Sequence, residues 1–104
     1  MIQELFSLSE KVALVTGGSY GIGFALASGM AKAGATICFN DISKDLVEKG
    51  LEAYAAEGID AHGYICDVTD EQQVQEMVKT IEEHIGVIDI LSIGVKSKAQ
   101  TPKT

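Results

Sequence analysis

The sequence has 104 residues, the size of one ordinary domain, and 46% of them are hydrophobic while 22% are charged. Its 15 acidic residues outnumber the 8 basic ones, and the net charge of −7 has the wrong sign for binding a nucleic-acid backbone or an anionic membrane. No apolar run is long enough to cross a bilayer and the N-terminus lacks the pattern of a secretory signal, so we expect a cytoplasmic protein with no nucleic-acid or membrane partner.

The first predicted elements are a short strand and a helix. The run VALVT at 12–16 is continuously apolar and too short for a helix, so we expect a buried strand. Apolar or small residues then recur at helical spacing over 21–33, and Gly34 is expected to end this helix. The small residues Ala25 and Gly29 are expected to let the helix approach the sheet closely.

A second strand and a second helix follow. The strand is predicted at TICFN, residues 36–40, and Ser43 is expected to cap the N-terminus of the helix after it. That helix presents a predicted core face formed by Leu46, Val47, Gly50, Leu51, Tyr54 and Ala55. The run GYIC at 63–66 then predicts a third strand.

The third helix and the fourth strand complete the pattern. Thr69, with Gln72 three residues later, matches a capping box that would start the helix. The helix is expected to end before Gly86, and its apolar residues at spacings of three and four are Val74, Met77, Val78, Ile81 and Ile85. The apolar run VIDILSI at 87–93 predicts the fourth strand.

This alternation predicts an α/β fold. Right-handed crossovers, with a reversal after the third strand, give a partial Rossmann (doubly wound) parallel sheet of about four strands in the order 3-2-1-4, with three crossover helices. The first two helices would cover one face of the sheet and the third helix the other. We expect residues 1–95 to form this unit and the basic tail, 96–104, to be disordered, because its few apolar side chains cannot offset the entropy of ordering.

A glycine-rich turn, TGGSYGIG at 16–23, lies between the first strand and the first helix. This order places backbone N–H groups and a positive helix terminus against a diphosphate. Gly17 permits the sharp exit from the strand, Gly21 leaves room for the backbone to approach a pyrophosphate, and Gly23 permits contact between helix and strand. We therefore expect the amides of residues 17–23 to hold an adenine dinucleotide, with Ser19 and Tyr20 lining the mouth of the turn.

Other polar residues follow the next two strands. Asp41 closes the second strand, where an acid can accept hydrogen bonds from an adenosine ribose, and Asp67 and Val68 close the third strand, where they would border an adenine. The alternative for either acid alone is a helix-capping role. Together they indicate a dinucleotide site at the carboxyl edge of the sheet, so that residues 1–95 are interpreted as the dinucleotide-binding half of a Rossmann domain.

Neither a metal site nor a disulfide framework is indicated. Cys38 and Cys66 are 28 positions apart with no CxxC pair, and His62 and His84 stand alone. We expect both cysteines to be buried as small apolar side chains in a reducing compartment, and both histidines to lie at the surface.

Four motifs in this order resemble the N-terminal half of the short-chain dehydrogenase/reductase family: TGGSYGIG, FND at 39–41, CDV at 66–68 and IDIL at 88–91. Within the family, the sequence is most similar to gluconate 5-dehydrogenases and less so to 3-oxoacyl-carrier-protein reductases. The resemblance implies that the cofactor diphosphate and ribose contact Gly17, Ser19, Tyr20, Gly21, Ile22 and Gly23. It further implies that Asp41 binds the adenosine ribose and that Asp67 and Val68 contact the adenine.

The cofactor is expected to be NAD or NADP. Asp41 would repel the 2′-phosphate of NADP, and the chain has no arginine to supply the usual counter-charge, which favours NAD. Lys44 lies close in sequence, however, and the resembled group includes NADP users. Both cofactors therefore stay open, with NAD preferred.

The catalytic part of the family pattern is absent from the sequence. Where the family continues with Asn-Asn-Ala-Gly, the chain has SIGV at 92–95, and no tyrosine is followed by a lysine four positions later. Hydride transfer to a carbonyl needs a proton donor, for which a tyrosine needs a neighbouring cation. The resemblance implies hydride transfer between nicotinamide and a sugar-acid ketone such as 5-ketogluconate.

Three hypotheses for the function follow. The chain is a truncated or frameshifted dehydrogenase product that is inactive alone, a non-catalytic nucleotide-binding or interaction module, or an enzyme completed by a partner chain. A fourth strand at the edge of the sheet would expose apolar side chains and unpaired backbone groups. We therefore predict either marginal stability or self-association through this strand.

Overall fold

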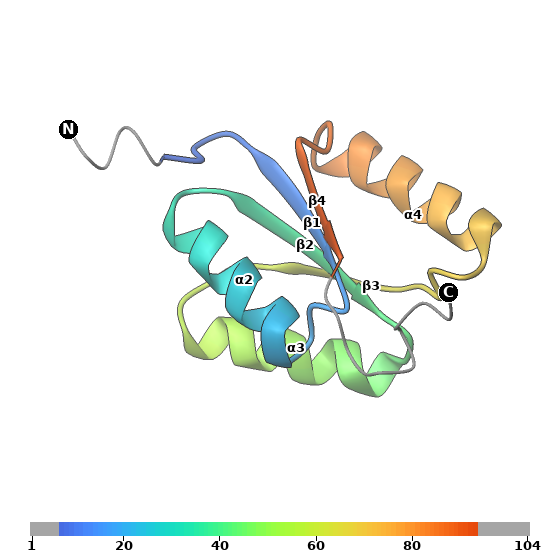
Figure 1. Cartoon of the computed structure of the whole chain (residues 1–104), viewed down its shortest axis with the longest axis horizontal. Helices are drawn as coiled ribbons and strands as arrows, with labels where there is room; N and C mark the ends of the chain where they lie inside the picture. Colours follow the sequence, from blue (N-terminus) through green and yellow to red (C-terminus); the bar gives the residue numbers. More distant parts are fainter. Residues whose placement is uncertain (1–6, 94–104) are drawn as a thin grey trace, which may run out of the picture.

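The computed structural model describes residues 7–93. Within them, one parallel sheet has the order β3-β2-β1-β4, which confirms the predicted topology (Figure 1). Its strands are β1 (Val12–Thr16), β2 (Thr36–Asp41), β3 (His62–Ile65) and β4 (Ile90–Ile93). Because all of them are parallel, their carboxyl ends meet at one edge of the sheet. The predicted tail, 96–104, lies outside the described residues.

The helices of the described part connect successive strands and form the two outer layers. They are α2 (Gly21–Lys32), α3 (Lys44–Ala56) and α4 (Glu71–His84). Figure 1 shows α2 and α3 on one face of the sheet and α4 on the opposite face. This division follows from right-handed crossovers combined with the reversal of strand order after β3.

Strand β1 is buried along its whole length and contributes to both cores. Ala13 and Val15 pack into the cluster beneath α2 and α3, whereas Val12 and Leu14 pack into the cluster beneath α4. Successive side chains of a strand point to opposite faces, so a continuous apolar run is what a central strand covered on both faces requires. Strand β1 thereby anchors the start of the glycine turn.

The buried face of α2 differs from the prediction. Gly29 and Ala25 are exposed, and a methyl group added at Gly29 would meet no atom within 4 Å. The buried residues of this helix are instead Gly23, Ala27 and Ser28. The reason is that apolar or small residues lie around most of the circumference of α2. Their spacing in the sequence therefore does not indicate which face packs against the sheet.

The start of α4 also corrects a prediction. The N-cap is Asp70, whose Oδ1 accepts hydrogen bonds from the amides of Gln72 at 3.1 Å and Gln73 at 3.3 Å. The Thr69 hydroxyl instead donates to Asp67 Oδ1 at 2.7 Å. A carboxylate at the helix N-terminus also interacts favourably with the helix dipole, which a hydroxyl does not.

The boundaries of three strands are shifted as well, and β2 ends at Asp41, one residue later than predicted. Strand β3 begins and ends one residue earlier than predicted, and β4 begins at Ile90 rather than Val87. The residues before Ile90 still contact β1, because Asp89 Oδ2 accepts from the Val12 amide at 2.9 Å and the Asp89 amide donates to the Val12 carbonyl at 2.8 Å. The Asp89 carboxylate therefore accepts the hydrogen bond from the Val12 amide that a backbone carbonyl would accept in a regular strand pair.

The face under α4 is only partly covered. A groove of about 440 Å³ is lined by residues of α4, of the strands and of their loops: Leu14, Thr16, Val68, Val74, Met77, Val78, Glu82, Ile88 and Leu91. Strand β4 forms the edge of the described sheet, and Leu91 on it is 62% exposed. The observation agrees with the expected open edge, and self-association through this edge stays a prediction.

Candidate functional site

The turn between β1 and α2 depends on glycine at several positions. Gly17 and Gly21 have φ angles of 69° and 67°, a conformation that residues with a side chain rarely adopt. A methyl group on Gly23 would overlap the carbonyl oxygen of Gly17 and lie 3.1 Å from Gly18 Cα. Gly23 thus allows α2 to begin directly against the start of the turn, a closer contact than the helix-to-strand contact predicted for it.

Two amides of the turn are used within the protein. The amides of Gly17 and Gly18 donate to the carbonyl of Asn40 at 2.9 and 3.3 Å. These bonds fasten the turn to the end of β2. The expectation that every amide from 17 to 23 faces a diphosphate is therefore wrong for these two.

Four other amides of the turn donate no hydrogen bond to the described residues. In the described part of the chain, no protein acceptor is found for the amides of Ser19, Gly21, Ile22 and Gly23. Tyr20 is the N-cap of α2 and provides no side-chain cap, and the first turn of the helix carries no acidic residue. The first amides of a helix need an acceptor from outside the helix, and together they form the positive end of its dipole. This helix terminus is thus suited to an anion.

The space around the turn fits the same ligand. A methyl group at Gly21 would meet no atom of the described residues within 4 Å, so the backbone is open to close approach. Ser19 is buried, and its hydroxyl oxygen has no hydrogen-bond partner within residues 7–93. Tyr20 and Ile22 are exposed beside it. The residues present therefore fit a diphosphate that accepts from backbone amides and from one serine hydroxyl.

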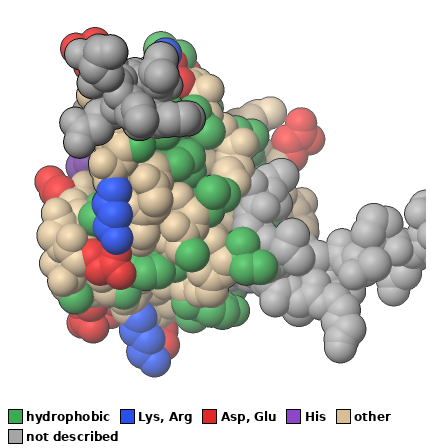
Figure 2. Space-filling view, turned by 60° about the vertical axis from the view of Figure 1, so that its left-hand side comes forward, with side chains coloured by type: hydrophobic (Ala, Val, Ile, Leu, Met, Phe, Trp, Pro, Cys, Tyr) green, Lys and Arg blue, Asp and Glu red, His purple; other side chains and the backbone are tan. Residues whose placement is uncertain are grey.

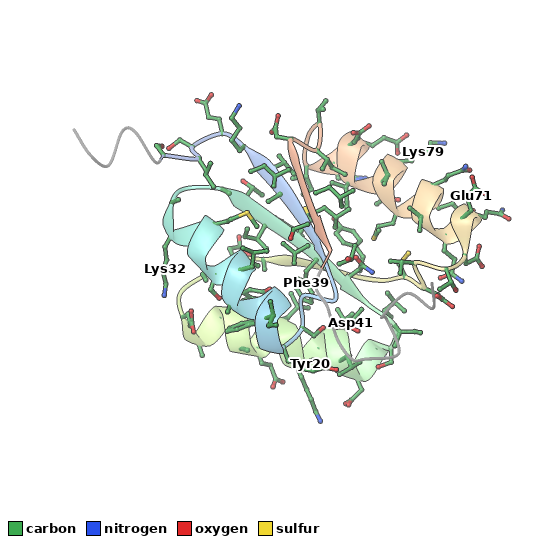
Figure 3. All side chains as sticks on the ribbon, viewed as in Figure 1. Tyr20, Lys32, Phe39, Asp41, Glu71 and Lys79 are labelled. Carbon is green, nitrogen blue, oxygen red and sulfur yellow. The ribbon has the colours of Figure 1, made fainter. Side chains whose placement is uncertain are left out.

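The end of β2 joins the turn to the end of β3. Asn40 Nδ2 donates to the carbonyl of Cys66 at 3.3 Å, and the Cys66 amide donates to the carbonyl of Asp41 at 2.9 Å. Asp41 is only 2% exposed, and its Oδ1 accepts from the Ile42 amide at 3.0 Å. Figure 3 shows Asp41 and Tyr20 at the same end of the molecule, on β2 and at the start of α2. The Asp41 carboxylate thus lies at the last position of β2, where the next amide of the chain donates to it.

Asp67 and Val68 follow β3 at the same edge. The Asp67 amide donates to Gln73 Oε1 at 2.9 Å, and Asp67 Oδ1 accepts from the Thr69 hydroxyl and from the Thr69 amide, at 2.7 and 2.9 Å. These bonds favour the charged carboxylate and lower the pKa of Asp67 below its ordinary value. Val68 is 51% exposed and lines the groove beside α4. An apolar surface is therefore available next to a fixed acid.

Replacing Thr69 with valine should raise the pKa of Asp67 toward its ordinary value, because the hydroxyl donor is lost while the backbone donor remains. Since the folded-state pKa is depressed, Asp67 stabilises the fold above its unfolded-state pKa, and this contribution disappears as the pH falls through the folded-state pKa. In the Thr69→Val variant, the free energy of unfolding should therefore change less as the pH falls through the acid range. NMR titration of the Asp67 side-chain carbon measures the pKa. An unchanged pKa in Thr69→Val would show that the Thr69 hydroxyl does not lower the pKa of Asp67.

One residue that contacts the turn was not predicted as part of the site. The Tyr54 hydroxyl in α3 donates to the carbonyl of Gly18 at 2.6 Å. Helical spacing predicts that Tyr54 belongs to the core, and the residue is fully buried. The available signal was the hydroxyl itself, because a buried tyrosine needs a hydrogen-bond partner.

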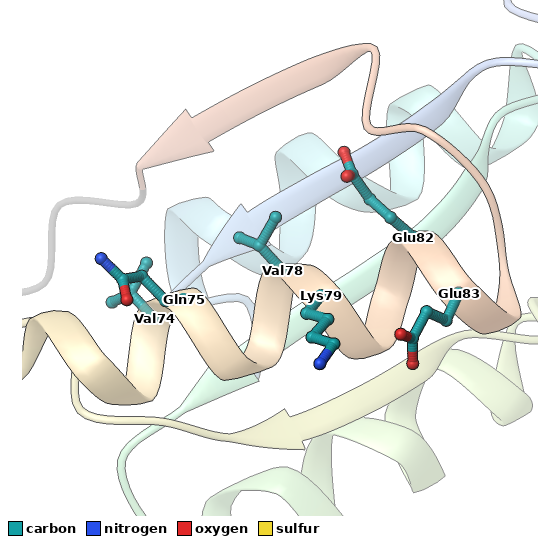
Figure 4. A pocket seen from close by; sticks show the side chains of 6 residues that line it. All are labelled: Val74, Gln75, Val78, Lys79, Glu82 and Glu83. Carbon is teal, nitrogen blue, oxygen red and sulfur yellow. The ribbon is translucent and has the colours of Figure 1, made fainter.

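Another hollow lies away from the turn. Its volume is about 490 Å³, and Figure 4 shows its lining side chains on α4 alone: Val74, Gln75, Val78, Lys79, Glu82 and Glu83. Figure 2 shows hydrophobic side chains reaching the surface at several separate places on another face. All residues that line this hollow belong to α4, and none belongs to the glycine turn. The turn therefore remains the candidate site.

Residues 7–93 contain neither a cluster of metal ligands nor a helix that could span a membrane. No cluster of three or more His, Cys, Asp or Glu side chains that could hold a metal ion occurs there. None of the helices of this region has the length and apolar character needed to span a membrane. Cys38 and Cys66 are free and buried, and burial raises the pKa of Cys38 to about 11, so its thiol stays protonated near neutral pH.

The strand order, the crossovers and the glycine turn at the carboxyl edge define a Rossmann-type α/β unit. The family profile for short chain dehydrogenase matches residues 11–102. The chain belongs to the short-chain dehydrogenase family, which confirms the resemblance inferred from the motifs. Members of this family are oxidoreductases that use NAD or NADP.

Several relatives are named for sugar-acid substrates. The chain is 45% identical over 103 residues to a 2-dehydro-3-deoxy-D-gluconate 5-dehydrogenase of Formosa agariphila, covering 98% of this chain and 39% of the relative. A crystal structure of 2-keto-3-deoxy-D-gluconate dehydrogenase from Streptococcus agalactiae is 55% identical with a TM-score of 0.86, covering 99% and 40%. A gluconate 5-dehydrogenase from Burkholderia cenocepacia J2315, solved with NADP and tartrate, is 35% identical with a TM-score of 0.78, covering 88% and 36%. The chain thus spans about two fifths of the length of these relatives.

Proposed function

We propose that the chain is the NAD(P)-binding portion of a short-chain dehydrogenase. The observation that carries the proposal is the start of α2, where the amides of Ser19, Gly21, Ile22 and Gly23 have no acceptor among residues 7–93, beside an open Gly21. The diphosphate would accept hydrogen bonds from these amides. Asp41 would accept from the adenosine ribose hydroxyls, and the adenine would lie between Asp67 and Val68, the latter being exposed.

The proposed reaction of the corresponding whole enzyme is oxidation and reduction of a sugar acid, between gluconate and 5-ketogluconate. Sugar-acid substrates in the names of similar proteins support this proposal. The bound nicotinamide would supply hydride chemistry. The residues of this sequence hold the dinucleotide but include no Tyr-x-x-x-Lys pair to donate a proton to the carbonyl oxygen. We therefore propose that the 104 residues alone bind the cofactor without turning over the sugar acid.

The preference between the two cofactors is proposed to favour NAD. A 2′-phosphate would be brought toward the negative Asp41, and like charges repel. Lys44, the nearest lysine in sequence, is exposed and pairs with Glu48 at 3.8 Å, so part of its charge is already balanced. The sequence has no arginine to replace it.

Titration of the 104-residue chain with NADH and NADPH in a calorimeter should show binding of both, with NADH tighter. Replacing Asp41 with serine should narrow the ratio of the two dissociation constants by about tenfold, since a nearby unit charge contributes roughly 1 kcal/mol or more. The control is Asp45→Ser, which removes the same charge from the exposed side of α3 and should leave the ratio unchanged. Absence of heat with either nucleotide at millimolar concentration, in a folded chain, would refute the proposal.

A further inference from the structure

Tyr54 lies directly behind the glycine turn. Its hydroxyl donates to the carbonyl of Gly18 at 2.6 Å, a contact between positions 36 apart in the sequence. Its ring lies between Phe24 and Phe39, with centroids 4.6 and 5.0 Å away. These neighbours fix the ring, so the hydroxyl has one orientation rather than several.

A second residue of α3 brings the helix against the same turn. Gly50 precedes Tyr54 by four positions, so both lie on one face of α3. A methyl group at Gly50 would lie 3.0 Å from Ser19 Cα and 2.9 Å from the Phe39 ring. This helix therefore packs against the backbone of the turn, and the Tyr54 bond is part of an extended contact.

The geometry of the peptide unit gives this bond a consequence for Ser19. In a planar trans peptide the C=O and the following N–H point in opposite directions. The bond from Tyr54 holds the Gly18 carbonyl toward α3, so the Ser19 N–H, in the same peptide unit, points away from α3. That amide is one of those without a protein acceptor in the described residues.

We propose that Tyr54 is a positioning residue for cofactor binding: its hydroxyl holds the Gly18–Ser19 peptide so that the Ser19 amide faces the diphosphate. The inference rests on the proposed function and extends it from the turn to α3, which packs against the backbone of the turn. Burial, and secondarily Glu57, raise the pKa of Tyr54, so the hydroxyl keeps its proton near neutral pH and always donates.

The test compares Tyr54→Phe with Tyr64→Phe in the full chain. The first change keeps the ring and removes the hydroxyl, and the second removes a hydroxyl in the cluster on the opposite face of the sheet. Loss of one hydrogen bond should weaken NADH binding by about three- to tenfold in Tyr54→Phe and leave it unchanged in Tyr64→Phe. In the absence of nucleotide, the Gly18 amide, which donates to Asn40, should exchange its hydrogen faster only in Tyr54→Phe.

The two measurements separate the possible failures. If the unaltered chain binds no NADH, the proposed function fails, and hydrogen exchange at the Gly18 amide still decides whether Tyr54 holds the turn. If the unaltered chain binds and Tyr54→Phe binds equally well, the positioning role is overturned while the proposed function stands. If Tyr54→Phe unfolds, all chains are compared in the stabilising osmolyte trimethylamine N-oxide. A variant that stays unfolded even there would indicate a purely structural role and overturn the inference.

Discussion

Replacing Gly23 with alanine should lower the free energy of unfolding by about 3 kcal/mol and abolish measurable NADH binding. The added methyl group would overlap the carbonyl oxygen of Gly17, and the neighbouring Gly18 Cα is also backbone, so no side-chain rotation can relieve the conflict. The turn would have to move away from α2. Urea denaturation followed by circular dichroism measures the stability, and calorimetry measures the binding.

Gly21→Ala is the matched control for this prediction. Within the part of the chain that the structure describes, its methyl group would meet no atom within 4 Å, and the cost to folding comes from the positive φ of 67°, on the order of 1 kcal/mol. Binding should nevertheless weaken, because the methyl group would occupy the space proposed for the diphosphate. A Gly23→Ala chain as stable as Gly21→Ala would contradict the close contact between the turn and α2.

Gly50→Ala should also destabilise the protein, by about 1–3 kcal/mol, although alanine normally favours a helix interior over glycine. The added methyl group would lie 2.9 Å from the buried Phe39 ring and 3.0 Å from Ser19 Cα. Overpacking of this kind outweighs the gain in helix propensity, which is about 1 kcal/mol. The shift in the urea midpoint, at constant slope, measures the change.

Gly29→Ala tests the opposite sign with the same chemical change. Gly29 lies inside α2, is exposed and has open space where the methyl group would project. This variant should be more stable than the unaltered chain by about 0.5–1 kcal/mol. A loss of stability in both variants, or a gain in both, would show that packing against Phe39 does not determine the outcome at Gly50.

The topology was predictable because it depends on local patterns and on chirality. The strand runs are short and apolar, the helical segments have recognisable ends, and crossover handedness then leaves few arrangements. Ser43 is one such end, and the prediction is confirmed by its bond from the Leu46 amide at 3.2 Å. Predicting the order of the strands in the sheet required no knowledge of individual contacts.

Other features depend on contacts that sequence spacing does not contain. The prediction of the packed face of α2 was wrong because small residues lie on several sides of that helix. The prediction that Thr69 caps α4 was wrong because its hydroxyl donates to Asp67 instead. The bond from Tyr54 to Gly18 joins positions distant in sequence. Likewise, no pattern indicates that the Gly17 amide donates to the end of β2 instead of a ligand. The individual cofactor contacts proposed at the turn stay predictions.

The environment of Phe39 couples mutations in separate parts of the chain. Methyl groups at Gly18, Gly50 and Gly63 would each come within 3.0 Å of this one side chain, from the turn, from α3 and from β3. Substitutions at Gly50 and Gly63 should therefore be non-additive, since both added methyl groups would meet the Phe39 ring and one rearrangement of that ring would serve both. A smaller residue at position 39 would relieve both of these contacts with the ring, whereas a methyl group at Gly18 would meet Phe39 Cβ, which a smaller side chain retains.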